Sequence, residues 1–237
     1  MRPLVIIPTY NERESLPQVV EGLLAHPDVR ILVVDDASPD GTGAIADALA
    51  ARHPARISVL HRSGERGLGR SYIDGLRAAL ATDATHICQM DADLSHNPAD
   101  IPRLLAAASD AELVIGSRYV PGGRIENWPL RRRLLSRYAN LYIRTITGLE
   151  THDNTSGFRC WTRGGLARMP LDRIESDGYA FLVELNWEAR RAGCRIAEVP
   201  ITFVERRTGA SKLSGRVLLE SAILPWALAG RARSAGR

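Results

Sequence analysis

The sequence predicts an α/β fold in which a mostly parallel central sheet is flanked by helices. Short apolar runs alternate with segments of helical apolar spacing through the first half of the chain. The apolar runs are nearly continuous, which is typical of parallel strands buried on both faces. A chain of 237 residues, 45% hydrophobic and 24% charged, is long enough for one large globular domain. We therefore expect a single domain over residues 1–237.

Each expected element follows from a local pattern. Strands are expected at residues 4–8, 31–34, 57–60, 87–90 and 113–115. Helices are expected at residues 16–24, near 45–49, at 72–80 and at 98–108. The last helix has Asn97 as an N-cap and Pro98 in its first position, followed by apolar residues at helical spacing. Residues 118–237 are less regular and give no firm assignment of elements.

The cysteines indicate a reducing compartment. Cys88, Cys160 and Cys194 are odd in number, and their spacings fit neither a zinc site nor a disulfide framework. We expect three reduced core thiols in a cytosolic protein.

No segment has the pattern of a signal peptide or a membrane span. Met1 runs almost directly into the first apolar run, and no window reaches the roughly 18 uninterrupted apolar residues that a span requires. The longest candidate, residues 217–230, is interrupted by Glu220 and Pro225. We expect a cytoplasmic protein that is not integral to a membrane by its own sequence.

Charge is unevenly distributed along the chain, whose formal net charge is +4. Residues 118–144 contain seven arginines and one acid, and residues 205–237 contain six arginines and the only lysine against two acids. The remainder is therefore net acidic. This division predicts a basic surface for a polyanion, and phosphates, nucleic acid and anionic lipid headgroups all stay open at this point.

Polar residues follow three of the expected strands at their carboxyl ends. These are the segments 8–12, 35–36 and 91–93. Ligands of open parallel sheets bind outside the carboxyl ends of the strands, so we expect the three segments to meet in one crevice.

The aspartates of residues 91–93 are the sharpest signal. Asp91 and Asp93 lie two residues apart beside a turn, where both carboxylates can face one Mg²⁺ or Mn²⁺ ion. Such an ion would act as a Lewis acid on a departing diphosphate. The alternative is an Asx-turn or a helix start, because Ser95 and the two residues after it are cap-like.

Two other strand ends suggest a nucleotide site. Asp36 could accept hydrogen bonds from a base or a ribose, although the alternative is a helix cap that Ser38 or Asp40 could supply unaided. Tyr10 offers an aromatic face for a base and Glu12 a carboxylate, although a simple strand-to-helix turn explains them equally well.

The glycines Gly67 and Gly69 precede the third expected helix. A dinucleotide fingerprint should follow the first strand, so we interpret this pair as a tight turn near the donor and reject an NAD site.

Six motifs in order identify a family resemblance. They are PTYNE at 8–12, DDASPDGT at 35–42, GLG at 67–69, DADLSH at 91–96, GSRY at 116–119 and FVERRTGASKLSG at 203–215. Together they resemble the dolichol-phosphate (polyprenol-phosphate) mannose synthase family of GT-A, Rossmann-like family-2 glycosyltransferases, over about residues 4–215. DADLSH, DNTSGFR at 153–159 and the segment 209–213 narrow the resemblance to the polyprenyl-phosphate branch, and residues 127–140 are most similar to its actinobacterial members.

The resemblance implies a role for each matching position. The nucleotide-sugar would be held by Pro8, Tyr10, Glu12, Asp36, Asp91, Ala92, Asp93, Arg206 and Lys212, and by Val34 through its backbone. The metal would be held by Asp91 and Asp93, with Ser95 where several relatives have glutamine, a stronger third ligand. The acceptor phosphate would be contacted by Arg118, Arg132, Arg131 or Arg137, Arg206 and Lys212. The catalytic set would be Asp91, Asp93, Arg118 and Lys212.

The implied activity is inverting transfer of mannose from GDP-mannose to a polyprenyl phosphate, with Mg²⁺ or Mn²⁺ as cofactor. A phosphate acceptor is already anionic at neutral pH, so the site needs cations for positioning rather than a general base. Two alternatives stay open: a related transferase that uses UDP-glucose or another nucleotide-sugar, and a non-catalytic module that binds nucleic acid or an anionic membrane. The aligned carboxylates argue against the module, because they repel a polyanion unless a metal is bound.

A lipid acceptor implies contact with a membrane surface. Residues 1–117 would form the nucleotide-sugar half, 118–215 the acceptor half, and 216–237 a C-terminal segment that either lies in the membrane interface or packs on the domain as a terminal helix. We expect a peripheral enzyme on the cytoplasmic face of the membrane, which a separate membrane protein could anchor. We expect no nucleic-acid partner.

Overall fold

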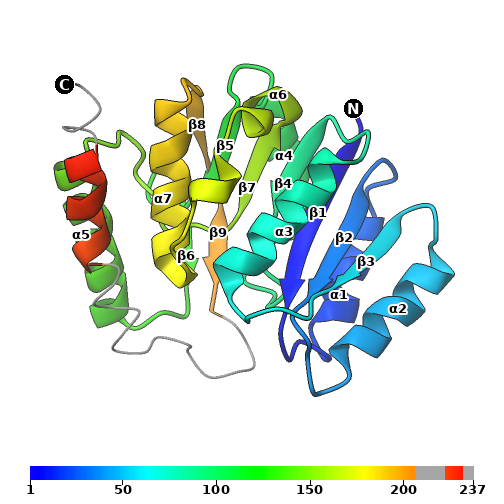
Figure 1. The fold of residues 1–237 in the computed structure, drawn as a ribbon. Coiled ribbons are helices and arrows are strands. Elements are labelled where there is room, and N and C mark those ends of the chain that lie inside the picture. Colours follow the sequence, from blue (N-terminus) through cyan, green and yellow to red (C-terminus); the bar gives the residue numbers. More distant parts are fainter. Residues whose placement is uncertain (206–221, 232–237) are drawn as a thin grey trace.

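A seven-stranded sheet forms the centre of the molecule in a computed structural model that describes residues 1–205 and 222–231 (Figure 1). The strand order is β3-β2-β1-β4-β7-β5-β8. The strands are β1 (Pro3–Thr9), β2 (Arg30–Asp35), β3 (Ile57–His61), β4 (His86–Gln89), β5 (Leu113–Ser117), β7 (Arg159–Thr162) and β8 (Ile196–Pro200). All are parallel except β7, which pairs antiparallel with β4 and β5. The predicted α/β class and mostly parallel sheet are confirmed.

The helices of the first half follow the predicted pattern. They are α1 (Leu16–Leu24), α2 (Thr42–Arg52), α3 (Leu68–Leu80) and α4 (Ile101–Ala107). The short helix η1 (Pro98–Asp100) precedes α4, and the Asn97 side chain caps it by accepting a hydrogen bond from the Ala99 N–H. The predicted N-cap is therefore confirmed.

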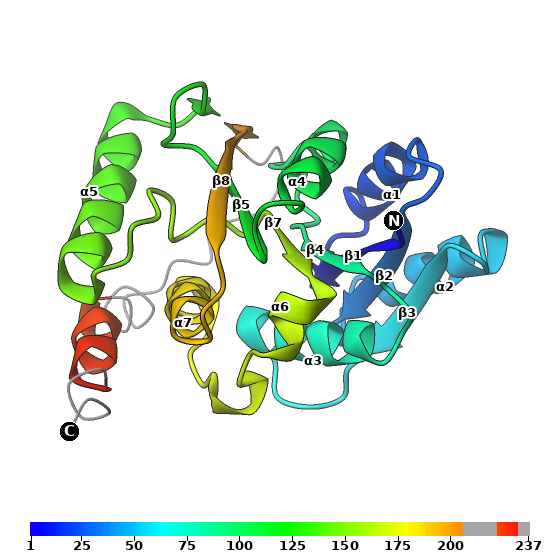
Figure 2. The ribbon, with the colours of Figure 1, turned by 90° about the horizontal axis from the view of Figure 1, so that it is seen from above.

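Helices cover both faces of the sheet, which explains why its strands are continuously apolar (Figure 2). Val5 and Ile7 of β1 belong to a core cluster with residues of α1, α2 and α4. Leu4 and Ile6 point to the other face and pack with residues of α3, α6 (Arg163–Ala167) and α7 (Gly178–Arg191). Successive residues of one strand thus enter opposite cores.

The second half adds elements that the sequence did not define. Strands β6 (Arg124–Glu126) and β9 (Thr202–Val204) form a separate parallel pair. Helix α5 (Leu130–Thr147) lies at one end of the molecule, far from α2 at the other end (Figure 1). The short helix η2 (Leu171–Arg173) precedes α7.

A third apolar cluster joins α5 and α7 to residues 222–231, which are helical. Leu224 and Leu228 are buried in this cluster, and the Tyr142 hydroxyl donates to the Ala222 carbonyl at 2.7 Å. Residues 222–231 therefore pack on the domain through Leu224 and Leu228.

The three cysteines are free and buried, as predicted. Within residues 1–205 and 222–231, no helix is long and apolar enough to cross a bilayer.

Candidate active site

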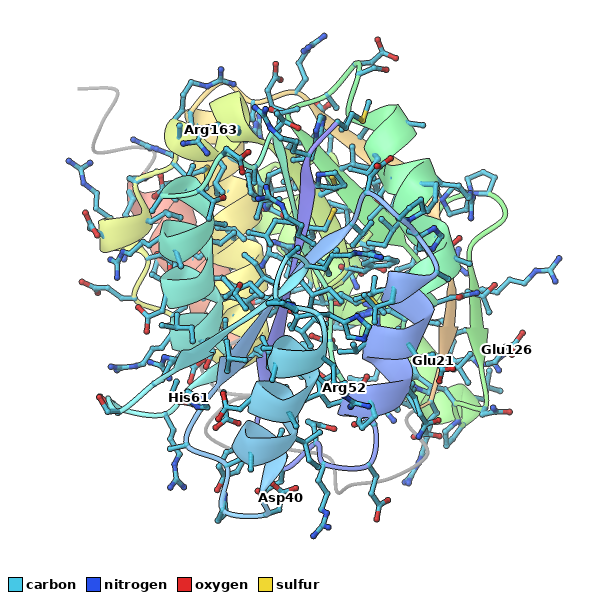
Figure 3. The ribbon with its side chains drawn as sticks, turned by 90° about the vertical axis from the view of Figure 1, so that its right-hand side faces the viewer. Glu21, Asp40, Arg52, His61, Glu126 and Arg163 are labelled. Atoms are coloured by element: carbon cyan, nitrogen blue, oxygen red, sulfur yellow. The ribbon has the colours of Figure 1, made fainter. Side chains whose placement is uncertain are left out.

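A cleft of about 670 Å³ opens at the carboxyl edge of the sheet. Its walls come from the ends of β1, β2 and β4, the start of α3, the loop 153–158 and the starts of α5 and α7. Asp40, in the loop after β2, lies at this end of the molecule, and Arg163, after the antiparallel β7, lies at the other (Figure 3). The cleft is lined by these predicted site residues: Pro8, Tyr10, Glu12, Asp36, Asp91, Ala92, Asp93, Arg118 and Arg132.

The strand-end loops turn sharply at residues with positive φ. Asn11, Ala37 and Leu94 have φ values of 61°, 54° and 64°, a region that non-glycine residues seldom occupy. Each of these three residues lies in one of the polar segments at the strand ends, so the chain turns away from the edge of the sheet there. Such local strain is typical of functional loops.

Asp91 is oriented by a buried tyrosine. The Tyr72 hydroxyl donates to Asp91 Oδ1 at 2.9 Å, and the Tyr72 ring stacks on Phe181 with centroids 5.9 Å apart. Burial and the negative charge of Asp91 raise the pKa of Tyr72 well above its ordinary value. The hydroxyl therefore stays protonated and remains a donor to the carboxylate.

Space beside Asp91 is kept open by Gly157. A Cβ at this position would lie 3.1 Å from both Asp91 carboxylate oxygens. Across the described residues there is no group of three His, Cys, Asp or Glu side chains suited to a metal, so Asp91 and Asp93 form a pair of carboxylates only. A hard ion accepts such a pair when water and phosphate oxygens complete its shell.

Ser95 lies under the cleft rather than in its lining. Its backbone N–H donates to Asp93 Oδ1 at 3.1 Å, so the predicted Asx-turn is present together with the carboxylate pair. Its Oγ is buried and has no hydrogen-bond partner within the part of the chain that the structure describes. The third-ligand role of Ser95 stays a prediction.

His96 is buried in the cleft wall. Its Nδ1 accepts from the Asp91 backbone N–H at 3.3 Å, and its Nε2 is buried without a hydrogen-bond partner among the described residues. The ring stacks on Phe158 and meets Phe203 edge-on. From the sequence we expected His96 only as a cap-like residue, so its place in the cleft wall was missed.

Asp35, the last residue of β2, and Asp36, the residue after it, have different surroundings. Asp35 accepts hydrogen bonds from Thr9 Oγ1 and from both the N–H and the hydroxyl of Ser38, so it holds the loop together. Asp40 accepts from the N–H and hydroxyl of Thr42, the first residue of α2, although the N-cap position itself is Gly41.

Asp36 is the aspartate that lines the cleft. Its carboxylate accepts from the Gly67 N–H at 2.9 Å and pairs with Arg62, which also donates to Asp74 at 2.7 Å. Asp36 thus ties the end of β2 to the N-terminus of α3. The tight turn predicted at Gly67 and Gly69 is wrong, because Gly67 is the N-cap of α3 in an extended conformation (φ 166°, ψ 142°) and Gly69 lies inside the helix. The Gly67 backbone does line the cleft, as expected.

Tyr10 and Glu12 both reach the cleft from the loop after β1. The Arg66 guanidinium lies 5.0 Å from the Tyr10 ring centroid and donates to the Tyr10 hydroxyl at 2.9 Å. Glu12 accepts from the Ser15 hydroxyl at 2.7 Å. Val34 packs its side chain in the core beneath α3, and the contact expected from its backbone stays a prediction.

Arg118 is fixed by a buried carboxylate. Asp153 accepts from its Nε and Nη2, each at 2.7 Å, and Thr155 accepts from the same Nη2. Burial alone would lower the pKa of Arg118, but the charge and hydrogen bonds of Asp153 raise it above the ordinary value. A rigid, permanently charged guanidinium therefore faces the cleft.

Arg132 supplies a second guanidinium from the first turn of α5. It lies 4.0 Å from the Trp128 ring centroid and pairs with Glu205. Arg131 and Arg137 are exposed and do not line the cleft, so the structure places Arg132 alone of the three in its wall. Arg206 and Lys212 lie outside the described residues.

Arg159 organises the loop that carries Gly157. It is fully buried and donates to the carbonyls of Ser156 and Leu182 at 2.8 and 3.0 Å. Burial lowers its pKa to about 10, which still leaves it protonated at neutral pH. The sequence showed a motif at 153–159, but it could not show which of its members face the site.

Acidic residues outside the predicted set also line the cleft. Asp177, at the start of α7, accepts from the Gly69 N–H at 2.6 Å, and Glu65 and Glu175 also line the cleft. Residues 175–179 carried no pattern that singled them out. An α/β fold with paired carboxylates and two fixed arginines in one cleft defines an enzyme suited to phosphorylated substrates.

Comparisons with known proteins specify the family. The model described as glycosyl transferase family 2 matches residues 4–173. The chain is 48% identical over 235 residues to the polyprenol monophosphomannose synthase of Mycolicibacterium smegmatis, covering 97% of this chain and 88% of that protein. It is 50% identical over 234 residues to the undecaprenyl-phosphate mannosyltransferase of Micrococcus luteus, covering 98% and 96%.

The fold also has solved relatives. The mannosyltransferase PcManGT of Pyrobaculum calidifontis, in complex with GDP-Man and Mn²⁺, aligns with a TM-score of 0.59 at 18% identity, covering 99% of this chain and 74% of that one. The chain belongs to glycosyl transferase family 2. The resemblance identified from its motifs is confirmed.

Proposed function

We propose that the protein transfers mannose from GDP-mannose to a polyprenyl phosphate, with inversion at the anomeric carbon. Two relatives about half identical over almost the whole chain carry names for this kind of reaction. The observation that carries the proposal is the cleft itself, which Asp91 and Asp93 line together with Arg118 and Arg132. Such a site brings two phosphorylated substrates together.

The donor half of the cleft presents carboxylates and a hydroxyl-bearing ring. Tyr10, Glu12 and Asp36 line it and are proposed to hold the guanosine. Asp91 and Asp93 fit a divalent ion on the diphosphate, because Gly157 leaves room beside Asp91 and a hard ion favours oxygen ligands. When bound, Mg²⁺ or Mn²⁺ would supply Lewis-acid neutralisation of the leaving diphosphate.

The acceptor half presents cations. Arg118 is held in place by Asp153 and Thr155, so it loses little freedom when it binds a phosphate oxygen. An oxygen of the lipid phosphate attacks the anomeric carbon, forming a C–O bond as the bond to the GDP oxygen breaks. The acceptor oxygen carries no proton to remove, so no side chain is needed as a base.

A lipid acceptor requires work at a membrane surface. We propose a peripheral position on the cytoplasmic face, which is compatible with a separate anchoring protein.

Purified protein incubated with radiolabelled GDP-mannose, Mn²⁺ and polyprenyl phosphate tests the proposal, with the label measured in the organic phase. Label transfer from GDP-mannose and little from UDP-glucose is expected. Transfer from UDP-glucose instead would support the alternative donor, and no transfer from either would overturn the proposal. Asp91→Asn is the matched inactive control, with circular dichroism to confirm its fold.

A further inference from the structure

Helix α5 exposes an apolar face to solvent. Five large apolar side chains of this helix are each between 58% and 70% exposed: Leu130, Leu134, Leu135, Tyr138 and Leu141. Four of them follow the spacing i, i+4, i+8, i+11, which places them in one stripe along the helix. A contiguous exposed stripe of this kind marks an interaction surface.

Basic residues flank the stripe. Arg133, Arg137 and Arg144 follow their own helical row beside it, and Arg131 lies on the other flank. Helix α5 contains no acidic residue. Along α5, the surface therefore combines apolar side chains with positively charged ones and no negatively charged ones.

The helix of residues 222–231 extends the same surface. It lies beside α5 in both ribbon views, and the Trp226 indole N–H donates to the Tyr142 hydroxyl at 2.9 Å (Figures 1 and 2). Ile223 and Trp226 are 56% and 61% exposed, whereas Leu224 and Leu228 are buried against the domain. Two adjacent helices thus bury one face and expose an apolar one.

This surface lies next to the acceptor side of the cleft. Arg132, in the first turn of α5, lines the cleft, whereas Leu134 and Tyr138 of the same helix face solvent. The Tyr119 hydroxyl donates to the Ser136 hydroxyl at 2.7 Å and fixes the inner face of α5 to the loop after β5. A ligand reaching Arg132 from the outer face of α5 would travel about one helix diameter, roughly 10 Å.

We propose that the outer face of α5, with Ile223 and Trp226, docks onto the surface of an anionic lipid bilayer. Apolar side chains would enter the boundary between headgroups and acyl chains, and the flanking arginines would contact lipid phosphates. The role of this docking in catalysis rests on the proposed function, because docking would bring the cleft close to a lipid acceptor. A second copy of the chain fits this surface poorly, because face-to-face packing would bring the arginines of the two copies together.

Sedimentation with vesicles of phosphatidylcholine and phosphatidylglycerol tests the docking. Wild-type protein should bind these vesicles, and should bind vesicles of phosphatidylcholine alone more weakly. Leu134→Glu combined with Leu141→Glu should weaken binding on the order of a hundredfold. Ala51→Glu, on exposed α2 at the other end of the molecule, is the control and should bind as wild type does.

The arginine contribution has its own variants. Arg133→Gln combined with Arg144→Gln should weaken binding to the anionic vesicles by roughly tenfold to thirtyfold and reduce its salt dependence. Arg52→Gln combined with Arg103→Gln, on α2 and α4, removes the same charge elsewhere and should have little effect. Figure 3 shows Arg52 on α2, away from this surface.

The outcomes separate this proposal from the proposed function. The Leu134/Leu141 variant should keep wild-type transfer to a short, water-soluble isoprenyl phosphate without vesicles, and lose transfer to long acceptors embedded in vesicles. Equal vesicle binding by this variant and wild type would overturn the docking surface whatever the activity. A wild-type protein that ignores vesicles and forms dimers broken by the same substitutions would overturn it in favour of self-association. Absence of transfer to any acceptor, with docking intact, would overturn only the proposed function.

Discussion

Asp153 accepts two hydrogen bonds of 2.7 Å from the Arg118 guanidinium, and both side chains are buried beside the cleft. The Arg118 backbone N–H also donates to the same carboxylate, at 2.9 Å. This pair sets both the position and the charge of the arginine, so its loss should affect stability as well as acceptor binding.

Asp153→Asn should destabilise the protein by about 3 to 5 kcal/mol, because it leaves the Arg118 charge buried and uncompensated. Urea unfolding at neutral pH measures the loss. Asp110→Asn, at an exposed position, is the control and should change stability little.

The same pair predicts a pH dependence. Burial alone would raise the pKa of Asp153, but Arg118 lowers it below the ordinary value of 3.8. A lowered carboxylate pKa contributes stability that is complete above 3.8 and is lost as the pH falls through the folded-state value. The stability difference between wild type and Asp153→Asn should therefore shrink under acid conditions, and a difference that stays constant would contradict the assignment.

Tyr72→Phe should lower the affinity for Mn²⁺ in the presence of GDP, and the transfer rate, by about tenfold or more. The substitution removes the hydroxyl that orients Asp91 but keeps the ring stacked on Phe181. Isothermal titration and initial rates measure the two effects. Wild-type values for both would show that the hydroxyl does not matter to the site.

Gly157→Ala should reduce activity on the order of tenfold to a hundredfold while the fold is retained, because its Cβ displaces the Asp91 carboxylate. Gly164→Ala is a matched control, since a Cβ there meets nothing within 4 Å. Initial rates of the two variants are compared. Equal activity would show that the space beside Asp91 does not matter to the reaction.

Gly75→Ala should destabilise the protein by about 1 to 3 kcal/mol. Helix α3 packs so closely on the sheet that the new Cβ would lie 2.6 Å from the Ile6 side chain. Thermal and urea unfolding measure the effect, which should be opposite in sign for Gly164→Ala because alanine favours an exposed helix. Unchanged stability of Gly75→Ala would mean that α3 can shift away from β1.

The first half of the fold was predictable because its signals are local. The apolar runs of β1, β2 and β4 are buried on both faces, and the carboxylates follow directly where each strand ends. Parallel topology then brings Asp36 and Asp91 to one edge. Expecting a common crevice from the strand ends was correct for that reason.

The second half depends on distant partners that no local pattern reveals. Strand β7 enters between β4 and β5 although it follows both in the chain, and it has only four residues. Helix α5 turns apolar side chains outward, so its pattern does not indicate a core-facing stripe. Asp153 pairs with Arg118, which lies 35 residues away in the sequence. The sequence pattern of Tyr72 is that of an ordinary core aromatic, and only the structure shows that its hydroxyl donates to Asp91.

The central claim is that Asp91 and Asp93 hold a divalent cation against the diphosphate of the donor. Titration of Mn²⁺ into wild type and Asp91→Asn, each with and without GDP, tests it by calorimetry. The account predicts Mn²⁺ binding that GDP strengthens in wild type and that is lost in the variant, with both proteins equally folded. Equal GDP-dependent Mn²⁺ binding by the two proteins would contradict it.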